Sequence, residues 1–467
     1  MAFESKGTVS SPQLALFEGF AKPTEYNILR PIHYLGSKLR VSDAICNAVE
    51  AVDPTARSVC DLFSGSGTMA YALSRKRNVV AVDIQEYSRV LCSAVLSSGN
   101  IPNSIVEQVC SEMRTSENYA QLAYAVEPLA RLEADRIGQA TRGNLEPLCD
   151  LLDQGSILGF EQRVDRSASA SVREAVADTI QRLADLGLSQ GPKAQVTRYF
   201  GGIYFSYKQA AQLDSILEAI TVVGPEQHDV FLAAALSTAS EIVNTIGKQF
   251  AQPLRPRNGQ GIAKRHLVGK IYRDRSFDAF DVYEMWLKRY LAIPWSEGKH
   301  TVLRKDYREA LQCLPEDVGV VYADPPYTRD HYSRYYHVLE TLCLRDNPPV
   351  STIRIHGETR YSRGFYRLVR HQSPFCIKSQ APAAFSSLFK AVKRLRVPLV
   401  LSYSPFDAKA GARPRLMTID AIQALASQEF HHVQVVPAGP LAHNKLNSSE
   451  HNVGTSQDAE ILIICRP

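Results

Sequence analysis

Four consecutive residues, Asp324-Pro325-Pro326-Tyr327, place a carboxylate, a rigid backbone and an aromatic ring directly after an apolar run that ends at Ala323. The two prolines remove two backbone donors and fix φ, so the loop holds its carbonyl oxygens in a set direction. An amine nucleophile needs acceptors for its two hydrogens and needs no acid. Asp324 can accept one hydrogen and the Pro325 carbonyl the other, which aims the nitrogen lone pair at a methyl sulfonium. The Tyr327 ring offers a stacking face for an extruded base.

A second group of residues has the types needed to hold a nucleoside. The apolar run 58–63 breaks at Gly65 and Gly67, where a strand would turn tightly into a helix and bare backbone could face a ligand. Asp83 closes the next apolar run and can accept hydrogen bonds from a ribose diol. Alone, the glycine turn also fits a plain turn or another nucleotide. With Asp83, it indicates a nucleoside-containing cofactor.

The elements that must position these residues are short apolar runs. Because the runs are almost wholly apolar, we expect strands covered on both faces, joined by helices in a doubly wound α/β sheet with the cofactor at the carboxyl ends of the strands. The predicted strands span 58–63, 78–83, 319–324, 398–403, 432–436 and 460–465.

The 263 positions between Asp61 and Asp324 are more than the chain length that one half of such a sheet needs. The separation therefore requires an inserted domain. Its apolar spacing from 104 to 222 is mostly helical, and the Pro/Arg/Gly-rich stretch 252–261 predicts irregular backbone. We therefore predict an N-terminal arm (1–27), a first part of the sheet domain (28–103), a helical, basic recognition region (104–304) and a second part of the sheet domain (305–467), which includes a basic insertion (329–378).

The order of these motifs resembles the Dam-type family of adenine-specific DNA methyltransferases, whose tetrad is Asp-Pro-Pro-Tyr. Residues 30–38, Arg-Pro-Ile-His-Tyr-Leu-Gly-Ser-Lys, resemble the N-terminal cofactor motif of that family. The loop 61–67, Asp83, the element 305–307 and the tetrad 324–327 follow in the same order. The long insertion and the Arg- and Tyr-rich segment after the tetrad depart from a minimal member.

The resemblance implies that S-adenosyl-L-methionine is the cofactor and that its methyl group passes to the exocyclic amine of adenine in double-stranded DNA after base flipping. It also implies a role in restriction–modification or phage defence, with a cognate restriction endonuclease as a partner, and an antiparallel strand at 461–465. It implies cofactor contacts from Tyr34, Gly36, Lys38, Asp61, Phe63, Gly65, Gly67, Asp83 and Asp306, and catalytic roles for Asp324, Pro325, Pro326 and Tyr327.

Other functions remain open at this point. The same tetrad chemistry serves adenine in RNA, the cytosine amine or a protein glutamine, and a DNA-binding module without catalysis or an interaction protein is a further alternative. Attack from cytosine carbon 5 would need a nucleophilic cysteine where Pro325 and Pro326 stand.

The charge distribution favours a polyanionic partner. The net charge is only +5, but basic residues exceed acidic ones by 8 over 245–308 and by 11 over 329–415, whereas acidic residues exceed basic ones by 6 over 100–190. Aromatic residues alternate with arginine after the tetrad, as in sites that stack unpaired bases. The DNA-binding candidates are Lys248, Arg255, Arg257, Arg329, Arg334, Arg354, Arg360, Arg363, Arg367, Arg370 and Lys378.

The remaining sequence patterns bear on the cellular compartment, on metal or membrane segments and on a further partner. Nine cysteines without a C-x-x-C pair favour reduced thiols in a cytoplasm and predict no metal site, and no apolar run is long enough for a membrane span. Gln13-Leu14-Ala15-Leu16-Phe17 resembles the peptide by which replication and repair proteins dock on a sliding clamp, although these side chains could instead pack on the chain's own core. We assign 201–206 and 244–250 to the recognition side, with core packing of Tyr204, Phe205 and Phe250 as the alternative. We expect His33, His331 and His337 to be polar fillers.

Overall fold

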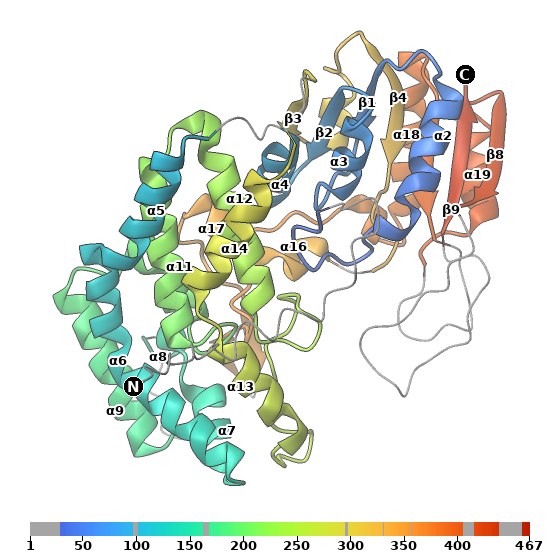
Figure 1. Ribbon diagram of the computed structural model, residues 1–467. Coiled ribbons are helices and arrows are strands. Elements are labelled where there is room, and N and C mark those ends of the chain that lie inside the picture. The colour runs from blue at the N-terminus through green and yellow to red at the C-terminus, as the bar shows by residue number, and fades with distance from the viewer. Residues whose placement is uncertain are drawn as a thin grey trace, which may run out of the picture.

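The computed structural model describes residues 29–96, 101–161, 168–294, 298–329, 331–355, 357–404, 415–438 and 460–467. The predicted arm, including Gln13–Phe17, lies outside the described residues. The described chain forms a sheet unit flanked by helices and a body made of helices beside it (Figure 1). None of the helices in these ranges has the length and apolarity needed to cross a membrane.

The sheet has seven strands within the described ranges, in the order β3-β2-β1-β4-β7-β9-β8. The strands from β3 to β7 are parallel, and β9 is antiparallel to both of its neighbours. This confirms the α/β class, the doubly wound order and the antiparallel strand expected at 461–465. The strands are β1 Ser58–Asp61, β2 Val79–Asp83, β3 Thr301–Arg304, β4 Val318–Ala323, β7 Leu399–Tyr403, β8 His432–Pro437 and β9 Ile461–Arg466.

Both faces of the central strands are buried, as a parallel sheet requires. Along β1 and β2, alternate residues enter two different apolar clusters, so that Val59 belongs to one and Cys60 to the other. The first cluster includes α2 Ser42–Val52, α3 Thr68–Ser74 and α4 Glu86–Leu96, and the second includes α15 Tyr307–Ala310, α18 Ala381–Leu395 and α19 Ile419–Ala426.

Two strand predictions need correction. The prediction that β8 is covered on both faces is wrong, because β8 is an edge strand whose residues are half-buried or exposed. Strand β3 was missed: residues 301–304 pair with β2 at the other edge, although we expected them in the insertion. Both errors concern edge strands, which need less apolar sequence than central ones.

The body is helical, as the spacing over 104–222 predicts. Its helix α12 packs against α4 of the sheet unit and thereby joins the two units. Tyr204, Phe205 and Phe250 are at most 1% exposed, so they pack in the core and do not form a recognition surface. The helices are α5 Asn103–Thr115, α6 Glu117–Thr141, α7 Glu146–Gln154, α8 Ile157–Glu161, α9 Ala170–Asp185, α10 Gln195–Phe200, α11 Tyr207–Ala219, α12 Pro225–Ile242, α13 Val268–Ser276 and α14 Ala279–Leu291.

The segment after the tetrad lies between the two units. Helix α17 (His337–Leu344) contacts both α4 and α12, and the short helix α16 (Tyr332–Tyr335) precedes it. Strands β5 (Thr352–Ile355) and β6 (Glu358–Tyr361) form a separate hairpin. Short 3-10 turns are η1 Leu39–Val41, η2 Pro192–Ala194, η3 Ile220–Val222, η4 Arg265–Leu267 and η5 Pro374–Cys376. All nine cysteines are free thiols.

Candidate active site

A pocket opens where the chain order of the sheet reverses, between the carboxyl ends of the adjacent strands β1 and β4. It encloses about 1150 Å³ of space, part of it open to solvent. All the predicted cofactor and catalytic residues except Gly65 and Gly67 line this single pocket. They are Tyr34, Gly36, Lys38, Asp61, Phe63, Asp83, Asp306, Asp324, Pro325, Pro326 and Tyr327.

The glycine loop lies in contact with the pocket wall and needs its glycines. Gly65 has a φ of +53°, and a Cβ there would come within 2.6 Å of the Tyr34 hydroxyl oxygen. Gly67 has a φ of +76° where it precedes α3. The Gly65 N–H donates to Asp83 Oδ2 at 3.0 Å, and the Gln85 N–H donates to Asp83 Oδ1 at 2.9 Å. Asp83 therefore fixes the loop, and each of its oxygens keeps a lone pair for a further donor.

Asp61 is the least satisfied polar group of the pocket. Its side chain is fully buried, and neither carboxylate oxygen has a hydrogen-bond partner among the described residues. Burial, with the negative charges of Asp324 and Asp83, raises the pKa of Asp61 to about 8. A buried acceptor without a partner costs about 1–3 kcal/mol, so this carboxylate is poised for a donor or a cation that a ligand would bring.

Lys38 connects the N-terminal motif to the tetrad. Its Nζ lies 3.1 Å from Asp324 Oδ1, 3.1 Å from Glu460 Oε1 and 3.4 Å from the Tyr327 hydroxyl oxygen. Burial lowers the pKa of Lys38, but the two carboxylates outweigh burial and the pKa is raised well above its usual value. Burial raises the pKa of Asp324 to about 7 against the attraction of Lys38. The lysine thus contacts the tetrad directly, and the cofactor contact expected of it stays a prediction.

Glu460 is a site residue that the motifs do not predict. Its buried carboxylate accepts a hydrogen bond from Ser402 Oγ at 2.7 Å besides contacting Lys38. Because β9 is antiparallel, the start of β9 lies beside the end of β7, where Tyr403 is paired with Ile461. The available signal was a single carboxylate directly before the last apolar run.

Two groups of aromatic side chains lie at the pocket, which Tyr34, Phe63 and Tyr307 line. On one side Tyr34 stacks on Tyr336, with ring centres 5.0 Å apart and planes 11° apart. On the other, the ring centre of Phe63 lies 5.6 Å from that of Tyr307, the residue after Asp306, and 5.5 Å from that of Phe375. Phe375 lies in no motif, and so the sequence does not single it out.

The Tyr327 ring is buried between charged and aromatic neighbours. Its centre lies 5.2 Å from the ring of Tyr403 and 4.9 Å from the Arg415 guanidinium carbon, and Lys38 Nζ is 5.1 Å away. Only 9% of the residue is exposed, so these neighbours fix the position of the ring at the end of the tetrad. The expected stacking of a base on this ring stays a prediction.

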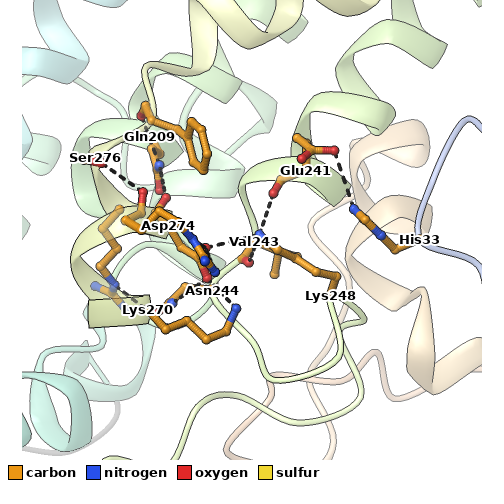
Figure 2. Close-up of polar contacts among 12 residues, drawn as sticks. His33, Gln209, Glu241, Val243, Asn244, Lys248, Lys270, Asp274 and Ser276 are labelled. Carbon is orange, nitrogen blue, oxygen red and sulfur yellow. Dashed lines mark hydrogen bonds and ion pairs between the residues drawn. The ribbon is translucent and has the colours of Figure 1, made fainter. Parts of the chain in front are cut away.

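The basic candidates fall into two groups. Lys248 donates to the carbonyl oxygens of Glu241 (2.7 Å) and Val243 (3.1 Å) at the end of α12 and lies 3.4 Å from Asp274 (Figure 2). Four more of the basic candidates form ion pairs with carboxylates: Arg257 with Glu146, Arg360 with Glu358, Arg363 with Asp153 and Arg367 with Asp346. Among the described residues no carboxylate forms an ion pair with Arg255, Arg329, Arg334, Arg354, Arg370 or Lys378.

The three histidines differ in their surroundings. His337 is fully buried between the carbonyl oxygens of Arg334 and Gly364, and burial lowers its pKa to about 4. It is therefore neutral at physiological pH, as expected of a polar filler. His33 lies 3.5 Å from Glu241, and His331 lines the pocket.

Residues 34–142, which include the glycine loop and Asp83, match the family model of D12 class N6 adenine-specific DNA methyltransferases. The resemblance to the Dam-type family is thereby confirmed.

Two relatives of the chain carry related names. Over 214 residues, 45% of this chain, it is 24% identical to modification methylase LlaI of Lactococcus lactis subsp. lactis. Over 383 residues, 80% of this chain, it is 22% identical to the type II methyltransferase M.FokI of Planomicrobium okeanokoites. The alignments cover 29% and 44% of these relatives, so the chain spans less than half of their length. No solved structure matches the chain.

Proposed function

We propose that this chain is an S-adenosyl-L-methionine-dependent methyltransferase that modifies the exocyclic amine of adenine in duplex DNA. The observation that carries the proposal is the convergence of the tetrad 324–327 and the unpaired Asp61 on one pocket at the adjacent strand ends of β4 and β1. The D12 match of residues 34–142 supports the same reaction. The names of the two relatives support a place in a restriction–modification system.

The residues of the pocket fit the proposed cofactor, which methyltransferase families generally use. The buried, unpaired carboxylate of Asp61 suits the ammonium group of its methionine part. Gly65 leaves open a space that a Cβ would fill against Tyr34. Phe63 and its aromatic neighbours would hold the adenine ring, with Asp83 near the ribose and Asp306 near the adenine amine. Bound there, the cofactor would supply a methyl sulfonium electrophile.

The chain's own residues would then orient the nucleophile. Asp324 and the Pro325 carbonyl accept the two amine hydrogens, so that the nitrogen lone pair is directed into the pocket. Lys38 favours the charged form of Asp324 and holds its carboxylate in place. Positioning and electrostatic stabilisation carry such a displacement, and no covalent enzyme intermediate is needed. With a pKa of about 7, Asp324 can also take up the proton that the methylated amine must lose.

The decisive experiment is sequencing with detection of modified bases, on DNA from cells with and without this protein. We expect N6-methyladenine at one recurrent sequence only when the protein is present. Incubation of the purified protein with labelled cofactor and unmethylated DNA, RNA or protein separates the alternatives. Label that enters RNA, cytosine or a glutamine side chain instead would overturn the adenine-in-DNA assignment.

Two partners form part of the proposal. A cognate restriction endonuclease would cut the same sequence, so DNA methylated by this protein should resist it. Docking on a sliding clamp through Gln13–Phe17, which lies outside the described residues, is tested by titrating a peptide of residues 8–22 against the clamp of the source organism. A peptide carrying Gln13→Ala, Leu16→Ala and Phe17→Ala serves as the control. Equal binding of the two peptides removes the docking idea.

A further inference from the structure

Two arginines are held against one tyrosine ring. The guanidinium carbons of Arg334 and Arg370 lie 4.5 and 5.5 Å from the ring centre of Tyr366, and Arg334 also donates to the Tyr366 hydroxyl at 3.1 Å. Within the described ranges neither arginine forms an ion pair with a carboxylate. Burial, together with the charge of Arg334, lowers the pKa of Arg370. Two like charges fixed side by side favour binding of an anion between or above them.

The bend that carries Arg370 presents two aliphatic side chains to solvent. Leu368 is 57% exposed and Val369 is 80% exposed. The backbone beneath them is fixed, because the Leu368 N–H donates to the Pro349 carbonyl and the Ser351 N–H donates to the Tyr366 carbonyl, both at 2.7 Å. Tyr366 itself is buried. The aliphatic pair is therefore held in position on the surface by an ordered support.

This bend adjoins the mouth of the pocket. The residues directly after Arg370, which are His371, Gln372 and Ser373, line the pocket. The residues directly before Arg334, which are His331, Tyr332 and Ser333, line it too. The arginine pair and the exposed aliphatic pair are thus joined along the chain to residues that line the cavity into which the tetrad faces, and we call these four residues the rim. Other exposed apolar side chains, such as Ile262, belong to segments without pocket-lining residues.

We propose that this rim, made of Arg334, Leu368, Val369 and Arg370, extrudes the target base from duplex DNA. The two arginines bind the phosphate diester beside the target nucleotide. Leu368 and Val369 fill the gap that the base leaves in the stack. Extruding a base costs a few kcal/mol, and apolar wedges inserted between base steps offset part of that cost. The inference rests on the proposed function for the identity of the base, and it adds the contact that delivers the base.

The arginine contact is tested by binding alone, without methyl transfer. Affinity for a fluorescein-labelled duplex of mixed sequence is measured against salt concentration for the wild type, for Arg334→Gln/Arg370→Gln, and for Arg131→Gln/Arg142→Gln. The control pair removes the same charge from α6 and from the residue that caps its C-terminus, far along the chain from the rim. Each lost phosphate contact flattens the logarithmic salt slope by about 0.9, so we expect a reduction of about two units for the rim pair and none for the control.

An unchanged slope for the rim pair overturns the arginine contact, whether or not the protein methylates DNA. Because Tyr366 packs under both arginines, thermal melting checks the fold of the double variant. Arg370→Gln alone, at an exposed position, gives half the effect if the double variant is unstable.

The aliphatic pair is tested on two duplexes that carry the sequence found by modified-base sequencing. In one the target adenine is paired, and in the other it faces an abasic site and needs no extrusion. Leu368→Ser/Val369→Ser should slow transfer to the paired duplex about tenfold or more and leave transfer to the abasic duplex near wild type. Val222→Ser, at a residue 53% exposed, is the matched control and should change neither rate. Equal losses on both duplexes, or no loss, overturn the wedge.

Discussion

Asp61 in the sheet unit and Asp274 in the helical body are both 0% exposed, yet their surroundings are opposite. Asp274 accepts from Lys270 at 2.7 Å and from Asn244 at 3.1 Å, and Lys248 lies 3.4 Å away (Figure 2). Burial alone would raise the pKa of Asp274, but these lysines outweigh it and the pKa is lowered. Asp61 has no such partner, and its pKa is raised to about 8.

The difference separates charge that stabilises the fold from charge kept for a ligand. In the body, Asp274 is matched by lysines, and Glu133 is paired with Arg275. In the pocket, neither carboxylate oxygen of Asp61 has a hydrogen-bond partner among the described residues, and Asp324 shares Lys38 with Glu460. Because an unmatched buried carboxylate destabilises the protein, its presence at a pocket wall favours a functional role.

The largest effect in this comparison should come from the body. Asp274→Ala leaves Lys248 and Lys270 near one another without their shared carboxylate, so we expect a loss of about 3–5 kcal/mol in the free energy of unfolding. Urea denaturation measures it. Asp281→Ala removes a 60% exposed partner of Arg114 and should cost less than about 1 kcal/mol. If both variants lose the same stability, the Asp274 cluster is not a stabilising element.

In the pocket the corresponding change should spare the fold and remove the reaction. Asp324→Ala deletes the pre-organised acceptor of the amine, so methyl transfer should fall on the order of 10²-fold or more while cofactor and DNA binding persist. Single-turnover transfer of labelled methyl measures the rate. Asp420→Ala, at an exposed position of α19, should behave as the wild type. Turnover near wild type in Asp324→Ala would show that the tetrad is not catalytic.

A smaller effect is expected at Asp61. Its substitution should raise the stability of the ligand-free protein and lower its affinity for the cofactor. Its folded pKa lies above its unfolded value, so the stability it contributes is full below about pH 4 and is lost as pH rises toward 8. Asp61→Asn removes that loss. The ligand-free variant should therefore be more stable than the wild type, by more at pH 8 than at pH 6.

The same substitution should weaken cofactor binding, because asparagine carries no charge for the cofactor's ammonium group. Thermal melting at both pH values, with and without S-adenosyl-L-methionine, measures both effects. A variant that is less stable at pH 8 and still binds the cofactor normally would show that Asp61 is a structural residue.

What the sequence predicts well are features set by neighbouring residues. The tetrad and the glycine loop fall at strand ends because an apolar run followed by proline or glycine defines both the strand and its end. What it misses depends on partners distant in the chain. Glu460 meets Lys38 only because β9 inserts between β7 and β8, and Arg363 meets Asp153 only through the packing of the body. Edge strand β3 is missed because half-burial requires little apolar sequence.

The smallest expected effect is a shift in the pH dependence of activity. It follows because Asp324 and Glu460 share Lys38. Asp324 faces Lys38, Glu460, Asp61 and the hydroxyls of Tyr322, Tyr327 and Tyr332. The negative charge of Glu460 raises the pKa of Asp324, and the charge of Lys38 lowers it. In Glu460→Gln the repulsion disappears, and glutamine can still accept from Lys38 and Ser402.

We therefore expect the acid limb of the plot of kcat against pH to move to lower pH in Glu460→Gln, by about one unit if the two carboxylates interact by about 1.4 kcal/mol. Asp324 must be deprotonated to accept the amine hydrogen, so a lower pKa extends activity toward acid. Glu429→Gln, which loses only a contact of 3.5 Å with Lys393, is the matched control and should leave the limb in place. A limb that stays fixed or moves to higher pH in Glu460→Gln would contradict electrostatic coupling of Glu460 to Asp324. A uniform loss of rate without a shift would make Glu460 a packing residue, since lost packing lowers the rate at every pH while lost charge moves the titration.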